Sequence, residues 1–331
     1  MKEKVEWVSI IRGITIMLVV IYHVQLVDMS TGCNHRFCEM IPQVYLPFFM
    51  PVFFFISGGL VYRSRILRDC GTIEFYKDKF VRILLPFIFF VTVYFSIKML
   101  FNSMVKTPAE LSFIYYLKSF VYYTDYPSKP LWFLPTLATM MLLYPIYKYA
   151  CERDVRIIVL LVLTVAFYYV DLSYIPNVFN IDELNKYLVF FCLGIVFFQK
   201  EMYKYFTSVN TLILSALLYG IVYCTELSLL KSFIGVLLTV NIGFMLEKNG
   251  ITTRIFTLFN DYLLQIYLMS MIFQGFVELV LWKKLFYNET LVYVFYSVNI
   301  ISGLFIPIII TKIIKKVPIK FIRLCFGLMK V

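Results

Sequence analysis

The hydrophobic residues of this chain are gathered into long runs that short polar stretches separate. A helix needs about 20 mainly apolar residues to cross the hydrocarbon core of a bilayer. Ten runs approach that length, at about 8–27, 43–62, 81–101, 131–150, 155–172, 186–199, 209–226, 229–246, 262–281 and 291–314. The alternation of apolar and polar positions that a membrane β-barrel requires is missing. The pattern predicts an all-α polytopic membrane protein with about ten transmembrane helices, and a short sixth run leaves nine or eleven open.

The composition excludes the other broad classes of protein. Of the 331 residues, 61% are hydrophobic and 15% are charged, whereas a soluble domain is nearer half apolar and a quarter charged. Too few polar residues are present to cover a soluble fold, and disordered chains are far less apolar. The sequence has no Gly/Ser-rich linker and no internal repeat, so we expect a single membrane domain over residues 1–331 without an appended soluble domain.

The basic residues fall on one side of the predicted membrane. With ten helices and the N-terminus inside, 22 of the 31 lysines and arginines lie on the inner side, while the 20 acidic residues divide evenly. The inner side then carries about +12 and the outer side about −1, as the positive-inside rule requires. We therefore expect both termini to be cytoplasmic. The formal charge of +11 is explained by topology, so it does not indicate a nucleic-acid-binding surface.

Two ionisable residues lie within the first apolar run. Arg12 and His23 are eleven residues apart, which is three helical turns plus about 20°, so they share one helix face about 16 Å apart along the axis. An ionisable side chain inside a span is costly and is by default a functional candidate. His23 is also one of two histidines in the chain. The alternative is that Arg12 extends to the inner headgroups and that His23 marks the outer interface.

Four short segments, in order along the chain, resemble a known family. They are an arginine and a histidine with ten residues between them, an apolar run that ends in Ser-Gly, a basic entry to the third helix, and a Trp-Phe-Leu start to the fourth. In this chain they correspond to Arg12 with His23, Phe53–Gly59, Lys79–Pro86 and Leu131–Leu134. Together they resemble the acyltransferase-3 family of integral membrane O-acyltransferases over about residues 10–330.

The resemblance implies an enzyme of the bacterial inner membrane. Such an enzyme moves an acyl group, usually acetyl, from cytoplasmic acyl-CoA to a hydroxyl of a cell-surface or lipid-linked glycan. His23 would be the general base that takes the proton of the hydroxyl, with a covalent acyl-histidine as the variant. The expected partners are membrane lipid, acyl-CoA and the glycan, with no nucleic acid. Acetyl-CoA or another acyl-CoA would be a co-substrate, and we expect neither a bound cofactor nor a metal.

The resemblance also assigns the remaining candidate site residues. Arg12, Lys79 and Arg82 would bind the acyl-CoA, because cationic side chains at the inner side suit its phosphates. Lys79 stands where many members have an arginine, so bidentate geometry is lost there. Many members also have a histidine after a Tyr-Leu pair in a late helix, but in this chain Tyr267-Leu268 is followed by methionine.

The candidates for binding the acceptor are outer-side residues. Trp132 and Tyr123 have aromatic rings that suit stacking on a sugar, although aromatic residues are also common at membrane interfaces. Asp28 follows His23 by about one and a half helical turns and is a candidate to orient the histidine or the acceptor.

Two other kinds of membrane protein fit the same hydrophobic pattern. A transporter or flippase of lipid-linked sugars usually has paired halves and charges buried within helices, and this chain has no detectable repeat. A polymerase of such sugars would need a dominant outer loop with catalytic arginines, but the loop at about 102–130 contains no arginine. We favour the acyltransferase and keep these two classes as the alternatives.

Overall fold

The computed structural model describes residues 6–27, 33–102, 110, 112–122, 126–285 and 288–328, except for the side chains of residues 284, 285 and 289. Its regular elements are all helices, as the hydrophobic pattern predicts. The predicted acceptor residues Asp28 and Tyr123 lie outside the described residues.

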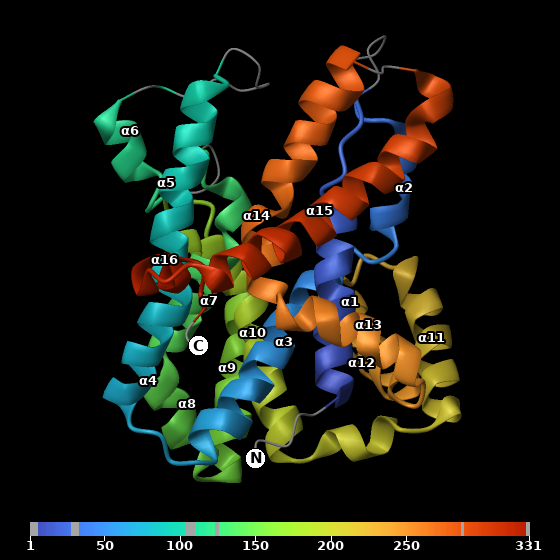
Figure 1. Ribbon diagram of the computed structural model, residues 1–331. Helices are drawn as coiled ribbons and strands as arrows, with labels where there is room; N and C mark the ends of the chain where they lie inside the picture. Colours follow the sequence, from blue (N-terminus) through green and yellow to red (C-terminus); the bar gives the residue numbers. More distant parts are fainter. Residues whose placement is uncertain are drawn as a thin grey trace.

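Sixteen α-helices and three π-helical segments make up most of the described chain (Figure 1). The α-helices are α1 (Glu6–Tyr22), α2 (Arg36–Gln43), α3 (Phe49–Val61), α4 (Thr72–Lys79), α5 (Leu85–Leu100), α6 (Phe113–Lys118), α7 (Phe133–Leu142), α8 (Tyr144–Cys151), α9 (Asp154–Tyr168), α10 (Ile181–Gln199), α11 (Val209–Tyr223), α12 (Ser228–Glu247), α13 (Gly250–Asp261), α14 (Leu263–Phe276), α15 (Val292–Lys316) and α16 (Lys320–Cys325). The π-helical segments are η1 (Tyr62–Ile66), η2 (Phe80–Leu84) and η6 (Val277–Leu285). Each of the ten predicted runs contains at least one of these helices.

Four helices of the described chain are long and apolar enough to cross a membrane by themselves: Thr72–Leu100, Ser228–Glu247, Leu263–Lys283 and Val292–Lys316. The chain is therefore a multi-pass membrane protein. The other apolar helices are shorter, so the count of ten crossings and the cytoplasmic position of the termini stay predictions. The fourth run is broken, because α7 ends at Leu142 and α8 begins at Tyr144. Pro145 accounts for the break, since it has no amide to donate to the carbonyl four residues back.

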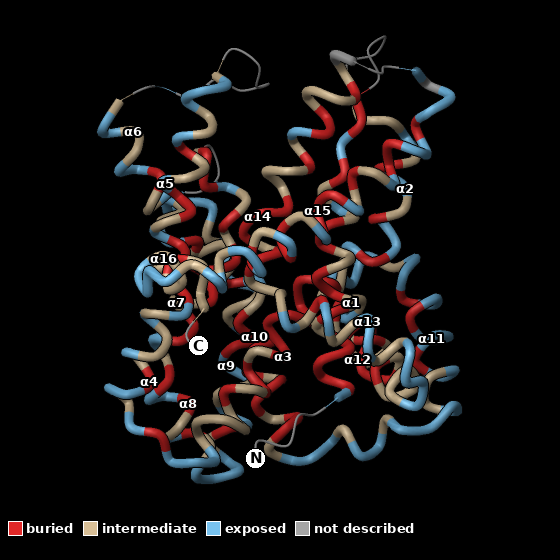
Figure 2. The backbone as a smooth tube through the Cα atoms, in the orientation of Figure 1, coloured by how far each residue is buried: buried red, intermediate tan, exposed pale blue. Residues whose placement is uncertain are grey.

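Helix α1 lies among other helices rather than on the surface. It contacts α3, α12, α13, α14 and α15, and Figure 2 shows buried segments concentrated around it and around α3 and α10. Polar or charged groups on α1 are therefore presented to protein and to internal cavities, which makes this helix a suitable carrier for a site.

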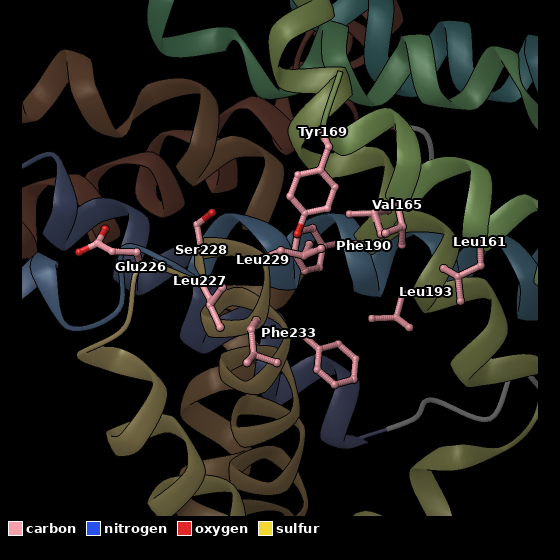
Figure 3. Close-up of a pocket in the computed structure, with 12 residues that line it drawn as sticks. Leu161, Val165, Tyr169, Phe190, Leu193, Glu226, Leu227, Ser228, Leu229 and Phe233 are labelled. Atoms are coloured by element: carbon pink, nitrogen blue, oxygen red, sulfur yellow. The ribbon is translucent and has the colours of Figure 1, made fainter. Parts of the chain in front are cut away.

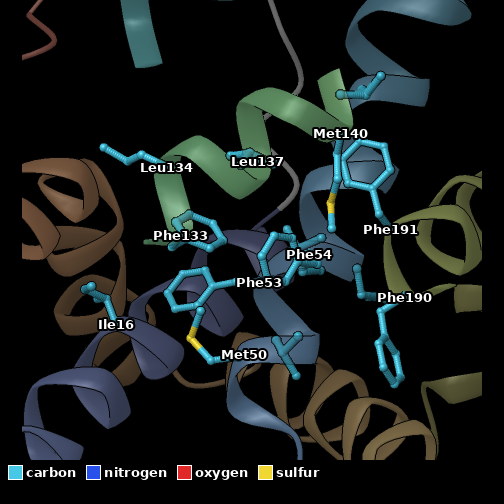
Figure 4. Packing of buried hydrophobic residues seen from close by; sticks show 14 of the residues in the cluster. Ile16, Met50, Phe53, Phe54, Phe133, Leu134, Leu137, Met140, Phe190 and Phe191 are labelled. Atoms are coloured by element: carbon cyan, nitrogen blue, oxygen red, sulfur yellow. The ribbon is translucent and has the colours of Figure 1, made fainter. Parts of the chain in front are cut away.

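Helices α3 and α10 form the tightest contact of the core. A Cβ atom at Gly58 would overlap the carbonyl of Phe191, and a Cβ at Gly194 would overlap that of Phe55, so both glycines are needed for this approach. Small residues that let backbones touch are typical of membrane helix pairs. The Ser-Gly end of the second apolar run thus has a packing role, next to the buried phenylalanines that fill the core in Figure 4.

Candidate active site

His23 lies at the end of α1, where the helix tightens. The amide of Val24 donates to the carbonyl of Ile21, three residues back, instead of continuing the α-helical pattern. The carbonyl of Val20 accepts a hydrogen bond from Nε2 of Gln274 in α14 at 2.8 Å. This bond from a neighbouring helix fixes the last turn of α1 and, with it, the backbone that carries the histidine.

The side chain of His23 lines a cavity of about 230 Å³, which we call the histidine cavity. Its lining residues come from α1 and the turn after it, α3 and the turn before it, α10, α14 and the segment before α7: Val19, Tyr22, His23, Leu46, Phe49, Met50, Pro130, Trp132, Tyr187 and Tyr267. The rings of Trp132 and Tyr187 stack with their centroids 5.7 Å apart and form one aromatic wall. The rings of His23 and Tyr22 pack edge to face, with their centroids 5.0 Å apart. The structure therefore brings two of the predicted site residues, His23 and Trp132, into one cavity.

Among the described residues that line this cavity, His23 is the basic one, and none is a lysine, an arginine or a carboxylate. In the part of the chain that the structure describes, neither ring nitrogen has a hydrogen-bond partner. An imidazole nitrogen that faces a cavity and has no partner is free to accept a proton from a molecule in that cavity.

Tyr267 lies two positions before Met269, where many family members have a histidine, and it lines the same cavity. Its hydroxyl donates to the carbonyl of Pro130 at 2.9 Å and accepts from the amide of Phe133 at 3.1 Å. Both hydrogen-bonding functions of the hydroxyl are thus used by the segment that carries Trp132. Tyr267 therefore helps to hold the segment that carries the aromatic wall in place.

Arg12 and His23 lie at opposite ends of one face of α1, which we call the α1 stripe. At the Arg12 end, the stripe lies beside α13. A Cβ at Gly13 would overlap the carbonyl of Phe256, so this glycine permits the contact between α1 and α13. The contact brings the end of α13 to Arg12, which interacts electrostatically with Asp261. Lys79, from the end of α4, also lies close enough to interact with Arg12. Gly13, which follows Arg12, is thus explained by the close packing of α1 against α13.

Asp78 joins two arginines that come from different π-helical segments. Its Oδ2 lies 2.6 Å from Nη2 of Arg65 in η1, and its Oδ1 lies 2.6 Å from Nε of Arg82 in η2. Lys79, the next residue, interacts electrostatically with both arginines. We call the whole group the basic cluster: Arg12, Arg65, Lys79, Arg82, Asp78 and Asp261. Since four cations face two carboxylates, the cluster has a surplus of positive charge.

A narrow apolar hollow of about 20 Å³ lies between the two ends of the stripe. Its lining residues are Ile16, Val19, Met50, Phe53, Phe133, Leu134, Leu263, Leu264 and Tyr267, of which Val19, Met50 and Tyr267 also line the histidine cavity. Ile16 and Val19 follow Arg12 by four and seven residues and therefore lie on the same helix face. One face of α1 thus leads from the basic cluster, past the hollow, to the histidine cavity.

The predicted donor residues Arg12, Lys79 and Arg82 meet in the basic cluster, and His23 and Trp132 meet in the histidine cavity. The sequence did not single out Arg65, Asp78, Asp261, Tyr187 or Gln274. The spacing of Asp78 and Arg82, four residues apart on a predicted helix, was a usable signal for their ion pair. The others depend on which distant helices meet.

Comparisons with known proteins identify the family of this chain. A family model described as an acyltransferase domain matches residues 5–326. A short stretch of 72 residues is 40% identical to the inner membrane protein YcfT of Escherichia coli (strain K12), which covers 19% of this chain and 20% of YcfT. The match thus spans about a fifth of the length of that relative. No solved structure matches the chain. Because the family match covers nearly the whole chain, transporters and polymerases are set aside, and the chain belongs to the acyltransferase-3 family as a membrane acyltransferase.

Proposed function

We propose that this protein moves an acyl group, most simply acetyl, from acyl-CoA bound at the basic cluster to a hydroxyl bound in the histidine cavity. The single observation that supports this most is the face of α1 that joins the two, with the apolar hollow between them. About 16 Å separates Arg12 from His23 along a helix. A donor with an anionic head and a long thin arm is the kind of molecule that this separation suits.

The basic cluster suits the anionic end of the donor. Arg12, Lys79 and Arg82 contribute three positive charges that come from two helices, and Asp78 holds the guanidinium of Arg82 at 2.6 Å. Guanidinium groups bind phosphate oxygens with two parallel hydrogen bonds, whereas lysine acts as a point charge. In this proposal the cytoplasmic end of α1 is the Arg12 end, as the distribution of basic residues predicts.

The thioester arm would extend from the basic cluster along the hollow to His23. At about 20 Å³ the hollow is close to the size of a single water molecule. The side chains of Leu264, Phe133 and their neighbours must therefore move apart when the arm enters. Closing around an apolar arm would keep water from the thioester and so protect it from hydrolysis.

In the transfer step, His23 alone can take up the proton of the hydroxyl and return it to the leaving group. Its free ring nitrogen accepts the proton of the acceptor hydroxyl as the oxygen attacks the thioester carbonyl. The carbon–sulfur bond then breaks, and the proton passes from His23 to the leaving thiolate, which gives an ester and free CoA. In the variant, the histidine nitrogen attacks first and the hydroxyl takes the acyl group from it. Both routes need no metal and no bound cofactor.

The histidine cavity suits a glycan as the acceptor. Its wall of Trp132 and Tyr187 is flat and aromatic, and sugar rings present C–H faces to such surfaces while their hydroxyls reach polar partners. We therefore propose that the acceptor is a cell-surface or lipid-linked glycan and that it is modified at the outer side of the bacterial inner membrane. Asp28 and Tyr123 remain predicted acceptor residues.

The test is mass analysis of the cell-surface glycans from a strain that lacks this chain. We expect one glycan to lose the mass of one acyl group per modified residue, which identifies the group and its acceptor together. Expression of the wild-type chain restores the mass, whereas His23→Ala, present in the membrane at the same level, does not. An unchanged set of glycan and glycolipid masses, or full restoration by His23→Ala, would refute the proposal.

A further inference from the structure

A second and larger cavity lies away from the α1 stripe. It is a groove of about 540 Å³ between α9, α10 and α12, which we call the α9–α12 groove (Figure 3). Its walls are apolar: Leu161 and Val165 come from α9, Val189 and Leu193 from α10, and Leu229 and Phe233 from α12. With more than twice the volume of the histidine cavity, it is roomy enough for a long chain of methylene groups.

The groove opens onto the lipid-facing surface of the protein. Its rim includes Tyr169 and Leu227, which are 71% and 58% exposed. The outer face of α9 continues this surface with Val162 and Leu163, which are also exposed. These helices fall in the predicted spans 155–172, 186–199 and 229–246, so the surrounding medium is hydrocarbon. An apolar groove in that position is filled by a hydrocarbon chain.

Tyrosine hydroxyls lie both at the rim of the groove and in the histidine cavity. Tyr168 at the end of α9 and Ser228 at the start of α12 share a hydrogen bond of 2.9 Å. Tyr187 of α10 lines the histidine cavity together with Tyr22, and it lies two residues before Val189, which lines the groove from the same helix. The groove and the cavity therefore share one polar edge at the same end of the bundle.

We propose that the α9–α12 groove binds the hydrocarbon chain of the acceptor, so that the acceptor is a glycolipid whose sugar crosses the polar edge into the histidine cavity. This rests on the proposed function. Lipid chains gain little from leaving the bilayer for an equally apolar groove. The groove therefore contributes orientation of the sugar hydroxyl toward His23 rather than affinity.

The negative charge of Glu226 bears on which lipid head groups the groove can accept. Glu226 is the charged residue among those that line the groove, and its side chain lies at the rim with Ser228. A carboxylate at this place repels a phosphate or diphosphate between chain and sugar. Because Glu226 is exposed and its charge is screened, this repulsion is small, and the proposal favours a neutral glycolipid over an anionic one by a small factor.

The first test measures occupancy of the groove directly. Hexadecyl glucoside with a diazirine at mid-chain is photolysed in phosphatidylcholine vesicles that contain the full-length protein, and the labelled residues are mapped by mass spectrometry. We expect labels on groove residues such as Val165 and Leu193, reduced at least fivefold in Leu193→Trp, which fills the groove, and unchanged in Val162→Trp on the outer face of α9. Labels spread over the outer face, or unchanged labelling in Leu193→Trp, would overturn the proposal. If a hexadecyl phosphate probe labelled the groove as strongly as hexadecyl glucoside, the preference for a neutral head group would be wrong.

The second test measures transfer from acetyl-CoA to hexadecyl glucoside and to methyl glucoside, which has no chain. Leu193→Trp should lower kcat/KM for the glycolipid roughly tenfold and leave that for methyl glucoside unchanged, and Leu161→Trp should do the same if Leu193→Trp does not fold. Equal losses for both acceptors would refute a role for the chain. Groove labelling, together with unchanged glycan and glycolipid masses in the strain that lacks this chain, would leave the groove assignment standing and refute the proposed function instead.

Discussion

The two ends of the α1 stripe are built from opposite kinds of residue. Among the described residues around His23, the lining is aromatic and aliphatic without a lysine, arginine or carboxylate, and the hydroxyl of Tyr267 is bonded to backbone groups. Around Arg12 four cations and two carboxylates meet, and Asp78 contacts two arginines at once. One end is therefore suited to a neutral molecule with rings and hydroxyls, and the other to an anion.

In the proposed reaction the two ends have different tasks. A base that must take a proton from a hydroxyl functions best when no fixed charge competes for it, which the neutral lining provides. A surplus of positive charge near the membrane is unfavourable until an anion or lipid headgroups compensate it. The helix between them sets the spacing. Each end is then expected to respond to substitution through a different substrate.

The largest effect is expected from removing the base. In His23→Gln a side chain of similar size remains, but it cannot accept a proton, so kcat should fall about 10²- to 10⁴-fold with little change in the KM for acetyl-CoA. Initial rates with radiolabelled acetyl-CoA in vesicles measure this. The matched control is His35→Gln: that histidine caps α2, where its Nδ1 accepts from the amide of Phe37 at 3.3 Å, and it should leave kcat intact. A His23→Gln enzyme with more than a tenth of wild-type kcat would contradict the assignment.

The next effect is expected at the opposite end. Arg12→Ala removes charge-assisted hydrogen bonds worth about 1.5–3 kcal/mol, so kcat/KM for acetyl-CoA should fall roughly 10- to 100-fold while the KM for the acceptor stays the same. Arg254→Ala, at an exposed position of α13, is the matched control and should change neither constant. A rise in the acceptor KM alone would show that Arg12 does not belong to the donor end.

The sequence predicts the two ends but not how they are supported. The eleven-residue spacing of Arg12 and His23 follows from the period of one helix, so it is readable from the chain alone. Tyr187 and Gln274 reach the His23 end from helices far along the chain, through contacts that depend on how α10 and α14 pack. The π-helical turns that carry Arg65 and Arg82 likewise depend on local packing. What the chain alone could have indicated is the break between α7 and α8, because Pro145 interrupts that run.

A smaller effect is expected from the aromatic wall. Trp132→Leu keeps an apolar side chain but removes the stacking surface, which is worth about 0.5–1.5 kcal/mol, so the acceptor KM should rise about two- to tenfold. The KM for acetyl-CoA serves as the internal control, because Trp132 lies in the histidine cavity and not in the basic cluster. Both constants come from the same initial-rate series. Equal rises in the two constants would indicate a general loss of structure rather than loss of a sugar contact.

The smallest effect is expected at Asp78, and its sign separates two roles of the basic cluster. If the carboxylate holds Arg65 and Arg82 in the geometry that binds phosphate, Asp78→Asn should raise the KM for acetyl-CoA about two- to fivefold. If charge alone matters, removing a negative group should lower that KM instead. Glu152→Gln is the matched control, because Glu152 pairs with Arg156 at 2.7 Å with the same i,i+4 spacing as Asp78 and Arg82 but at a more exposed site. Its KM should equal that of the wild type, and salt titration should weaken any effect of charge alone more than an effect of geometry.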